Sequence, residues 1–160
     1  MSNRRDKTSN WLIACLLLVV GVAAFLLIEP QLRPRVSVAV GDGVFKARVA
    51  QTQEQRDEGL SGVKYLESNE AMLFLFDSSD KWSMWMKDME MPLDILWLDQ
   101  SQKVIYIVKG ASPDDFPKSY IPNDPALYVL ELPQGTVDSK NIRIGSKATF
   151  NLDEARRMKQ

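Results

Sequence analysis

Hydrophobic residues form one long uninterrupted run near the N-terminus of the chain. Residues 11–28 carry no charge and no proline. A helix of that length, rising about 1.5 Å per residue, extends roughly 27 Å, close to the hydrocarbon thickness of a bilayer. Arg4, Arg5 and Lys7 precede the run, and basic residues on this flank favour a cytoplasmic N-terminus. The pattern predicts a transmembrane anchor over residues 11–28, preceded by a cytoplasmic tail over residues 1–10.

A cleaved secretory signal is the alternative explanation of the same run. Val22-Ala23-Ala24 has the small-residue character of a cleavage site. The apolar stretch continues to Ile28, however, and this makes it longer than the roughly 7–15 residues of a signal-peptide core. We therefore expect an uncleaved, single-pass anchor in the cell inner (cytoplasmic) membrane, in contact with the lipid bilayer through residues 11–28, with the C-terminal domain in the periplasm or extracytoplasmic space.

After the anchor, the hydrophobic pattern changes to the alternation of β-strands. Residues 29–34 contain two prolines and are predicted to form a stiff spacer, followed by a folded domain over residues 35–152. A hairpin is predicted from two alternating runs joined by Gly41-Asp42-Gly43. A second hairpin is predicted around Gly145-Ser146. Apolar runs of strand length lie between the two hairpins, at residues 71–76, 82–86, 93–98, 104–108 and 126–132.

Helical signals are sparse in the predicted domain. Thr52 and Gln55 have the spacing of a capping box, and they predict a short helix over residues 53–58 that ends at Gly59. Seven to nine short strands with one short helix predict a mainly β fold, a small β-sandwich or barrel. Residues 153–160 are predicted to form a charged, helical tail. The longest irregular connection is residues 112–125, which contain four prolines.

The composition excludes several kinds of chemistry. The chain has no histidine, and its one cysteine, Cys15, lies in the predicted anchor. These two facts rule out Ser-His-Asp and Cys-His catalysis, histidine-ligated zinc or iron, and a disulfide within the domain. The net charge is −1 and no basic cluster stands out, so no nucleic-acid partner is expected. No cofactor is expected either.

Methionines and tryptophans alternate in the middle of the chain. In a strand, Trp82, Met84 and Met86 would share one face, with Trp85 on the other. Thioether sulfur favours Cu(I), and this makes four methionines candidate ligands, namely Met84, Met86, Met89 and Met91. The alternative, which we favour, is that these side chains fill gaps in the core beside tryptophan rings.

Charged residues interrupt the apolar strands at two positions, Asp94 and Glu131. A buried carboxylate must be paired or hydrogen-bonded, and Lys87 is the candidate partner. One hypothesis is a buried ion-pair network that fixes strand register. A second is a site that binds an amine, a sugar or a hard cation, and a third is acid–base chemistry on a glycosidic bond. The candidate binding residues are Trp85, Lys87, Asp88, Asp94 and Glu131.

Five blocks of sequence together resemble one family. They are residues 56–61 (RDEGLS), 72–76 (MLFLF), 85–89 (WMKDM), 92–95 (PLDI) and 128–131 (YVLE). Their order and spacing resemble the bacterial and archaeal "domain of unknown function 192" family over about residues 36–150. The resemblance implies a small all-β domain, often behind a signal or an anchor, and it implies no activity.

Three functions are compatible with these observations. The favoured one is a non-catalytic ligand- or partner-binding accessory module of the cell envelope, whose partner is an envelope protein or a glycan, because it requires neither a nucleophile nor an imidazole base. The first alternative is a carboxylate-dependent hydrolase of an envelope glycan. The second is a Met-rich domain that handles Cu(I).

Overall fold

The computed structural model describes residues 11–22 and 35–157, and the chain divides into two compact units, Met1–Arg33 and Pro34–Gln160. In the first unit, residues 11–22 are helical. Among the described residues, no helix combines the length and the apolar character that a membrane span requires. Residues 23–28 of the predicted anchor, the predicted tail and the predicted spacer lie outside the described residues.

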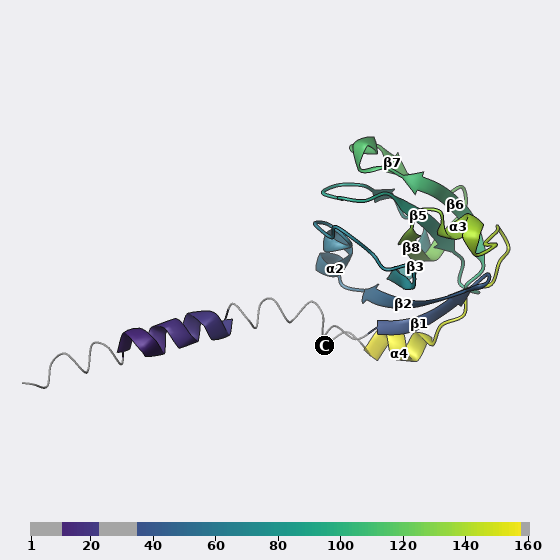
Figure 1. Cartoon of the computed structure of the whole chain (residues 1–160). Helices are drawn as coiled ribbons and strands as arrows, with labels where there is room; N and C mark the ends of the chain where they lie inside the picture. Colours follow the sequence, from purple (N-terminus) through teal and green to yellow (C-terminus); the bar gives the residue numbers. More distant parts are fainter. Residues whose placement is uncertain (1–10, 23–34, 158–160) are drawn as a thin grey trace, which may run out of the picture. The chain divides into compact units, whose positions relative to one another are not determined.

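The second unit is mainly β, with a mixed sheet and a few short helices (Figure 1). Its main sheet has six strands in the order β1-β2-β3-β8-β5-β6, and β4 pairs with β7 in a separate ribbon. The strands are β1 (Arg35–Val40), β2 (Gly43–Ala50), β3 (Glu70–Asp80), β4 (Met84–Trp85), β5 (Leu93–Leu98), β6 (Val104–Ala111), β7 (Ser119–Tyr120) and β8 (Ala126–Pro133). The helices are α2 (Gln53–Glu58), the 3-10 turn η1 (Pro113–Asp115), α3 (Thr136–Ser139) and α4 (Leu152–Arg157).

The predicted first hairpin and the predicted short helix are confirmed. β1 and β2 are antiparallel and meet at Val40 and Gly43. The next strand, β3, runs parallel to β2, so the chain between them must cross back along the sheet, and α2 lies in this crossover. The Thr52 hydroxyl accepts a hydrogen bond from Gln55 N, and the Gln55 side chain accepts one from Thr52 N. This capping box starts α2 at the predicted residue.

Apolar side chains cover both faces of the main sheet. One cluster includes Leu73 and Leu96, and the other includes Phe74 and Trp97. Because neighbouring residues of a strand point to opposite faces, β3 and β5 contribute to both clusters. All six residues of β5 are buried, which explains why its sequence is apolar at every position except Asp94 rather than alternating.

The predicted second hairpin is wrong. The turn itself forms, since Ser146 N donates to Arg143 O, but the two flanks do not pair with each other. Lys147 bridges instead to Lys103, just before β6, and Thr149 bridges to Ala39 in β1. Both edge strands of the sheet are therefore hydrogen-bonded to one short C-terminal segment. In place of a sandwich of two facing sheets, the domain has this one six-stranded sheet and a two-stranded ribbon.

The prediction of a single helix within the domain is corrected by α3, which is only four residues long and has too few turns to produce a helical hydrophobic period. Residues 153–157 of the predicted tail are helical, as the sequence indicated. α4 lies in the predicted charged tail, and its Ala155 is fully buried in the same cluster as Leu73. The tail therefore contributes to the core of the domain.

Candidate functional site

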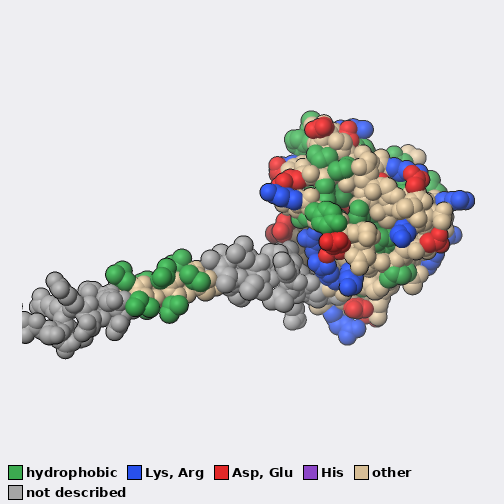
Figure 2. All heavy atoms as spheres, viewed as in Figure 1, with side chains coloured by type: hydrophobic (Ala, Val, Ile, Leu, Met, Phe, Trp, Pro, Cys, Tyr) green, Lys and Arg blue, Asp and Glu red, His purple; other side chains and the backbone are tan. Residues whose placement is uncertain are grey.

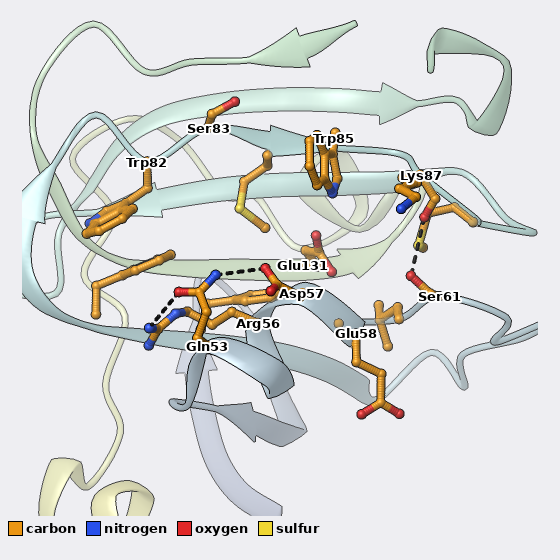
Figure 3. A pocket seen from close by; sticks show the side chains of 16 residues that line it. Gln53, Arg56, Asp57, Glu58, Ser61, Trp82, Ser83, Trp85, Lys87 and Glu131 are labelled. Atoms are coloured by element: carbon orange, nitrogen blue, oxygen red, sulfur yellow. Dashed lines mark hydrogen bonds between the residues drawn. The ribbon is translucent and has the colours of Figure 1, made fainter. Parts of the chain in front are cut away.

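A pocket of about 140 Å³ lies between α2 and the segment of residues 82–89 (Figure 3). Residues of β3 and β8 line its base. Its volume is close to that of a cavity of about 150 Å³ that holds benzene. The lining side chains are Gln53, Arg56, Asp57, Glu58, Leu60, Ser61, Phe74, Phe76, Trp82, Ser83, Met84, Trp85, Lys87, Met89 and Glu131, and the backbone of Gly59 completes the wall.

The α2 side of the pocket is held in place by Arg56. Its guanidinium donates to Gln51 O at 2.7 Å and to Leu75 O at 3.1 Å, and it lies 5.3 Å from the centre of the Phe76 ring. Gln53 accepts a third hydrogen bond from Arg56 and donates one to Asp57 (Figure 3). These contacts fasten α2 to β3, and they also occupy most of the polar groups on this rim.

The opposite side of the pocket is aromatic. Trp82 stacks on Phe76 with the ring centroids 4.1 Å apart. Its indole N–H donates to Ser78 O, and its own carbonyl accepts from the Trp97 indole, so this ring is fixed. Trp85 lies in β4 and is 51% exposed. The pocket therefore has one fixed tryptophan and one that a ligand can reach.

A loop junction closes the end of the pocket near Ser61. The Ser61 hydroxyl donates to Lys87 O at 3.3 Å, and Gly62 N donates to Asp88 O at 2.9 Å. Lys87 lines the pocket with an exposed side chain, whereas Asp88 is exposed and does not line it. Of the two residues, only Lys87 is positioned to contact a ligand in this pocket.

Glu131 contributes a carboxyl group to the base of the pocket (Figure 3). The residue is 4% exposed, and its neighbours across the sheet are Met72 and Ile95. In the described part of the chain, no hydrogen bond reaches its carboxyl oxygens. Burial raises the pKa of Glu131 to about 8, against a smaller opposing effect of the Arg48 charge. The group is therefore mostly protonated at neutral pH.

Asp94 lies on the other face of the sheet, and this overturns the hypothesis of a network that joins Lys87, Asp94 and Glu131. The register pairs Glu131 with Ile95 and Asp94 with Leu132, so the two carboxyl groups point in opposite directions. Asp94 is 1% exposed and accepts hydrogen bonds from Gly110 N and Val137 N, both at 2.9 Å. Its role in this geometry is to join β5 to β6 and to α3.

The four candidate methionines do not converge on one place. Met84 and Met89 line the pocket, Met86 is fully buried in the core beneath it, and Met91 packs against the same core without lining the pocket. Trp82, Met84 and Met86 all pack on one side while Trp85 is exposed, as the alternation predicted. Within residues 11–22 and 35–157, no group of three or more His, Cys, Asp or Glu side chains is arranged to hold a metal ion.

Sequence reasoning missed the α2 side of the pocket and the role of Trp82. Arg56 and Asp57 stand in the first block that resembled the family, and that block could have marked them as candidates. The position of Phe76 could not be deduced, because it depends on the parallel pairing of β2 with β3. Of the five candidate binding residues, the structure brings together Trp85, Lys87 and Glu131.

The fold and the pocket lie within one family match. The family model, described as an uncharacterized ACR, covers residues 36–150. The chain belongs to this family, DUF192, whose function is not established. It is 30% identical over 113 residues to a UPF0127 protein of Thermococcus sibiricus (strain DSM 12597 / MM 739), and the aligned part covers 69% of this chain and 70% of the relative.

Solved structures that are similar to this chain include the following two. A protein of unknown function from Novosphingobium aromaticivorans DSM 12444 has a TM-score of 0.68 and 28% identity, over 71% of this chain and 84% of that one. A protein from Sinorhizobium meliloti 1021, provisionally described as a transcription regulator, has a TM-score of 0.70 and 25% identity, over 74% and 95%. The family has no assigned activity, and the residues of the pocket are therefore the guide to function.

Proposed function

We propose that this protein is a non-catalytic binding module of the cell envelope that takes a small ligand into the pocket between α2 and residues 82–89. One observation carries the proposal: the carboxyl group of Glu131, on a residue that is only 4% exposed, lines a pocket that also has an accessible tryptophan. A polar group that has lost most of its water costs free energy unless it finds a polar partner. A ligand in the pocket would satisfy it.

The walls of the pocket support binding because they are formed before a ligand arrives. Arg56 fixes α2 through backbone carbonyls, and the stack of Phe76 on Trp82 fixes the aromatic side. Small-molecule sites are usually preformed, mostly apolar and equipped with a few polar groups. A preformed wall also reduces the ordering cost of binding.

We further propose that residues 11–28 anchor the protein in the inner membrane and that the domain lies in the periplasm or extracytoplasmic space. The support is the uncharged apolar run together with its basic N-terminal flank at Arg4, Arg5 and Lys7. In this location the ligand would come from the envelope, either free or as part of an envelope protein or glycan.

A carboxylate-dependent hydrolase is the second candidate function. The specific observation in its favour is the raised pKa of Glu131, because a protonated carboxyl group near neutral pH is what a general acid needs. Asp57 lines the same pocket from α2 and would have to act as the ionised partner. If the protein is a hydrolase, the wild-type chain should hydrolyse an aryl glycoside or an envelope glycan fragment, and Glu131→Gln should abolish this activity. A non-catalytic binding module should hydrolyse neither substrate.

Thermal denaturation of the full chain tests the binding proposal. The chain is kept in a detergent because residues 11–28 are proposed to be a membrane anchor. A non-ionic polyoxyethylene detergent is suitable, since its head group is neither a sugar nor a choline. The probes are choline, ethanolamine, glucose, N-acetylglucosamine and acetate. We expect at least one probe to raise the melting temperature in a concentration-dependent manner, since a ligand that binds only the folded state stabilises it.

Two substitutions locate the effect. Trp85→Ala should abolish the shift, and it removes an exposed ring rather than a core side chain. Glu154→Gln, on the exposed surface of α4, should leave it unchanged. The proposal fails if no probe produces a saturable shift, or if the shift persists in Trp85→Ala.

A further inference from the structure

We infer that the ligand of this pocket is a small organic cation, whose ammonium group lies against Trp85 and Trp82 and pairs with the Glu131 carboxylate. This inference rests on the proposed function, because it names the ligand class of the same pocket. This ligand class follows from the aromatic wall of the pocket and from the apolar surroundings of Glu131 at its base.

The cross-sheet neighbours of Glu131 at the base of the pocket, Met72 and Ile95, are apolar. An ionised carboxylate in such surroundings is costly unless a cation accompanies it. The carboxyl group points into the pocket (Figure 3). A cationic ligand would therefore meet its counter-charge at the base, away from most of the solvent.

The positively charged side chains near the pocket do not ionise Glu131 at neutral pH. Arg48 favours the ionised form of Glu131, yet the pKa of Glu131 remains at about 8, so this charge is not enough to ionise the group at neutral pH. The Arg56 guanidinium donates to backbone carbonyls and to Gln53. Lys87 has an exposed side chain at the rim. Ionisation of Glu131 at neutral pH therefore requires further positive charge at the base, and a cationic ligand would supply it.

The aromatic wall also favours a cation. The face of a tryptophan ring attracts ammonium groups, and recognition of quaternary ammonium ligands uses such rings. Trp82 and Trp85 line the pocket together with the polarisable sulfur atoms of Met84 and Met89. These four side chains attract a cation without providing directional hydrogen bonds.

Neutral and anionic ligands suit the pocket less well. A sugar needs several hydrogen-bonding partners, whereas the base offers one carboxyl group and the polar side chains of α2 mostly bind one another or the backbone. An anion would have to keep Glu131 protonated and would lie beside Asp57 and Glu58. A volume of about 140 Å³ fits an ammonium head group and a few carbon atoms.

A cation that pairs with ionised Glu131 should bind more tightly as the pH rises. The ionised fraction of a group with a pKa of about 8 increases about tenfold between pH 6 and pH 7. Affinity should follow this increase and level off above pH 8. The charged groups that face Glu131 or line the pocket with it are Arg48 on β2, Arg56, Asp57 and Glu58 on α2, and Lys87.

Titration of the full chain with matched probes tests the ligand class. Choline and 3,3-dimethylbutan-1-ol have nearly the same shape and a hydroxyl group, but only choline carries a charge, and ethanolamine provides a smaller cation. Binding is followed by tryptophan fluorescence and by calorimetry in the polyoxyethylene detergent. We expect at least one of the two cations to bind about tenfold or more tightly than the neutral alcohol, because only a cation gains electrostatic attraction from the ionised carboxylate and from the tryptophan rings.

Substitutions then show which residues cause the preference for a cation over the neutral alcohol. Glu131→Gln should reduce cation affinity to the level of the neutral alcohol and remove the pH dependence, whereas Glu154→Gln should change neither. Trp85→Ala should weaken cation binding as well, and its exposed position keeps the test valid if Glu131→Gln folds poorly.

Two groups of results overturn the inference. If the neutral alcohol, glucose or acetate binds in a Trp85-dependent manner as tightly as the better-binding cation, the ligand class is wrong while the binding function stands. The same holds if cation affinity is unchanged by Glu131→Gln. If no probe binds at all, the inference and the proposed function fail together.

Discussion

The two buried carboxyl groups of the sheet differ in what their oxygens contact. Asp94 accepts two backbone N–H groups, so its burial is compensated by hydrogen bonds that also tie three elements together. Glu131 has apolar neighbours and is compensated by protonation instead. At the residue scale, Asp94 is therefore a structural group, and Glu131 is the group with unused capacity to bind.

Substitution of Asp94 should destabilise the domain strongly. Asp94→Ala leaves Val137 N without an acceptor in a buried place and Gly110 N without one in a partly buried place. An unsatisfied buried group costs about 1–3 kcal/mol. We expect the free energy of unfolding to fall by about 3–5 kcal/mol. Urea denaturation followed by tryptophan fluorescence measures this if the denaturant slope is unchanged. Glu154→Gln serves as the exposed control, and equal stability of Asp94→Ala and wild type would contradict the assignment.

Substitution of Glu131 should change how stability depends on pH. The folded chain keeps a proton on Glu131 up to a pH of about 8, whereas an ordinary glutamate, with a pKa of 4.5, loses it earlier. The wild-type free energy of unfolding should therefore fall as the pH rises from about 4.5 to 8, and then level off. Glu131→Gln should be close to wild type at pH 5 and more stable by about 2–4 kcal/mol at pH 8.5.

The same urea titrations at both pH values give the answer for Glu131. Glu154→Gln, which removes an exposed carboxylate, should follow the wild-type curve at each pH. A difference between Glu131→Gln and wild type that is the same at pH 5 and pH 8.5 would show that the Glu131 pKa is not raised by folding.

Sequence reasoning identified both buried carboxylates but could not assign them to faces. Each stood out because it interrupts an apolar run. Whether they share a face depends on register, and a shift of one residue between β5 and β8 moves every side chain to the opposite side. The observed pairing of Glu131 with Ile95 rather than with Asp94 is set by contacts along the whole of both strands.

At the scale of elements, the helix and the hairpin that are specified by local sequence signals were predicted well. α2 begins and ends at the predicted residues because its capping box and its glycine stop lie within eight positions of one another. The first hairpin has a turn signal between its strands. The parallel pairing of β2 with β3 and the separate partners of Lys147 and Thr149 depend on distant segments, and no local signal specifies them.

The capping box of α2 provides a test at this scale. Thr52→Ala removes the side-chain acceptor for Gln55 N, and the loss of an N-cap of this kind costs about 1 kcal/mol. We expect that decrease in the free energy of unfolding, together with weaker ligand binding, because α2 forms one wall of the pocket. Thr52→Ser keeps the hydroxyl and should restore both quantities. If Thr52→Ser is as impaired as Thr52→Ala, the cap is not the cause.

At the scale of the whole molecule, the pocket is assembled from three distant parts of the chain. α2, the segment of residues 82–89 and β8 meet only because β3 lies between β2 and β8 in the sheet. Figure 2 shows lysine, arginine and acidic side chains of both signs distributed over the visible face of the domain.

The proposed location of this pocket can be tested independently of its ligand. If residues 11–28 span the inner membrane with Arg4, Arg5 and Lys7 on the cytoplasmic side, a reporter that works only in the cytoplasm should give no signal when it is fused after Gln160. Arg33 and Arg35, on the other flank of the apolar run, oppose this charge bias in part. Strong reporter activity would contradict the proposed topology.

A matched control makes the result of the fusion interpretable. Each arginine placed at the centre of a spanning helix costs about 2.5–3.5 kcal/mol of insertion free energy, so Leu18→Arg combined with Val20→Arg should prevent insertion. In that variant the domain should remain in the cytoplasm and the reporter should become active. A silent reporter in both forms would point to a fusion that fails to fold, and an active one in both would show that residues 11–28 do not export the domain. Only the combination of a silent wild type and an active double variant supports a pocket that faces the envelope.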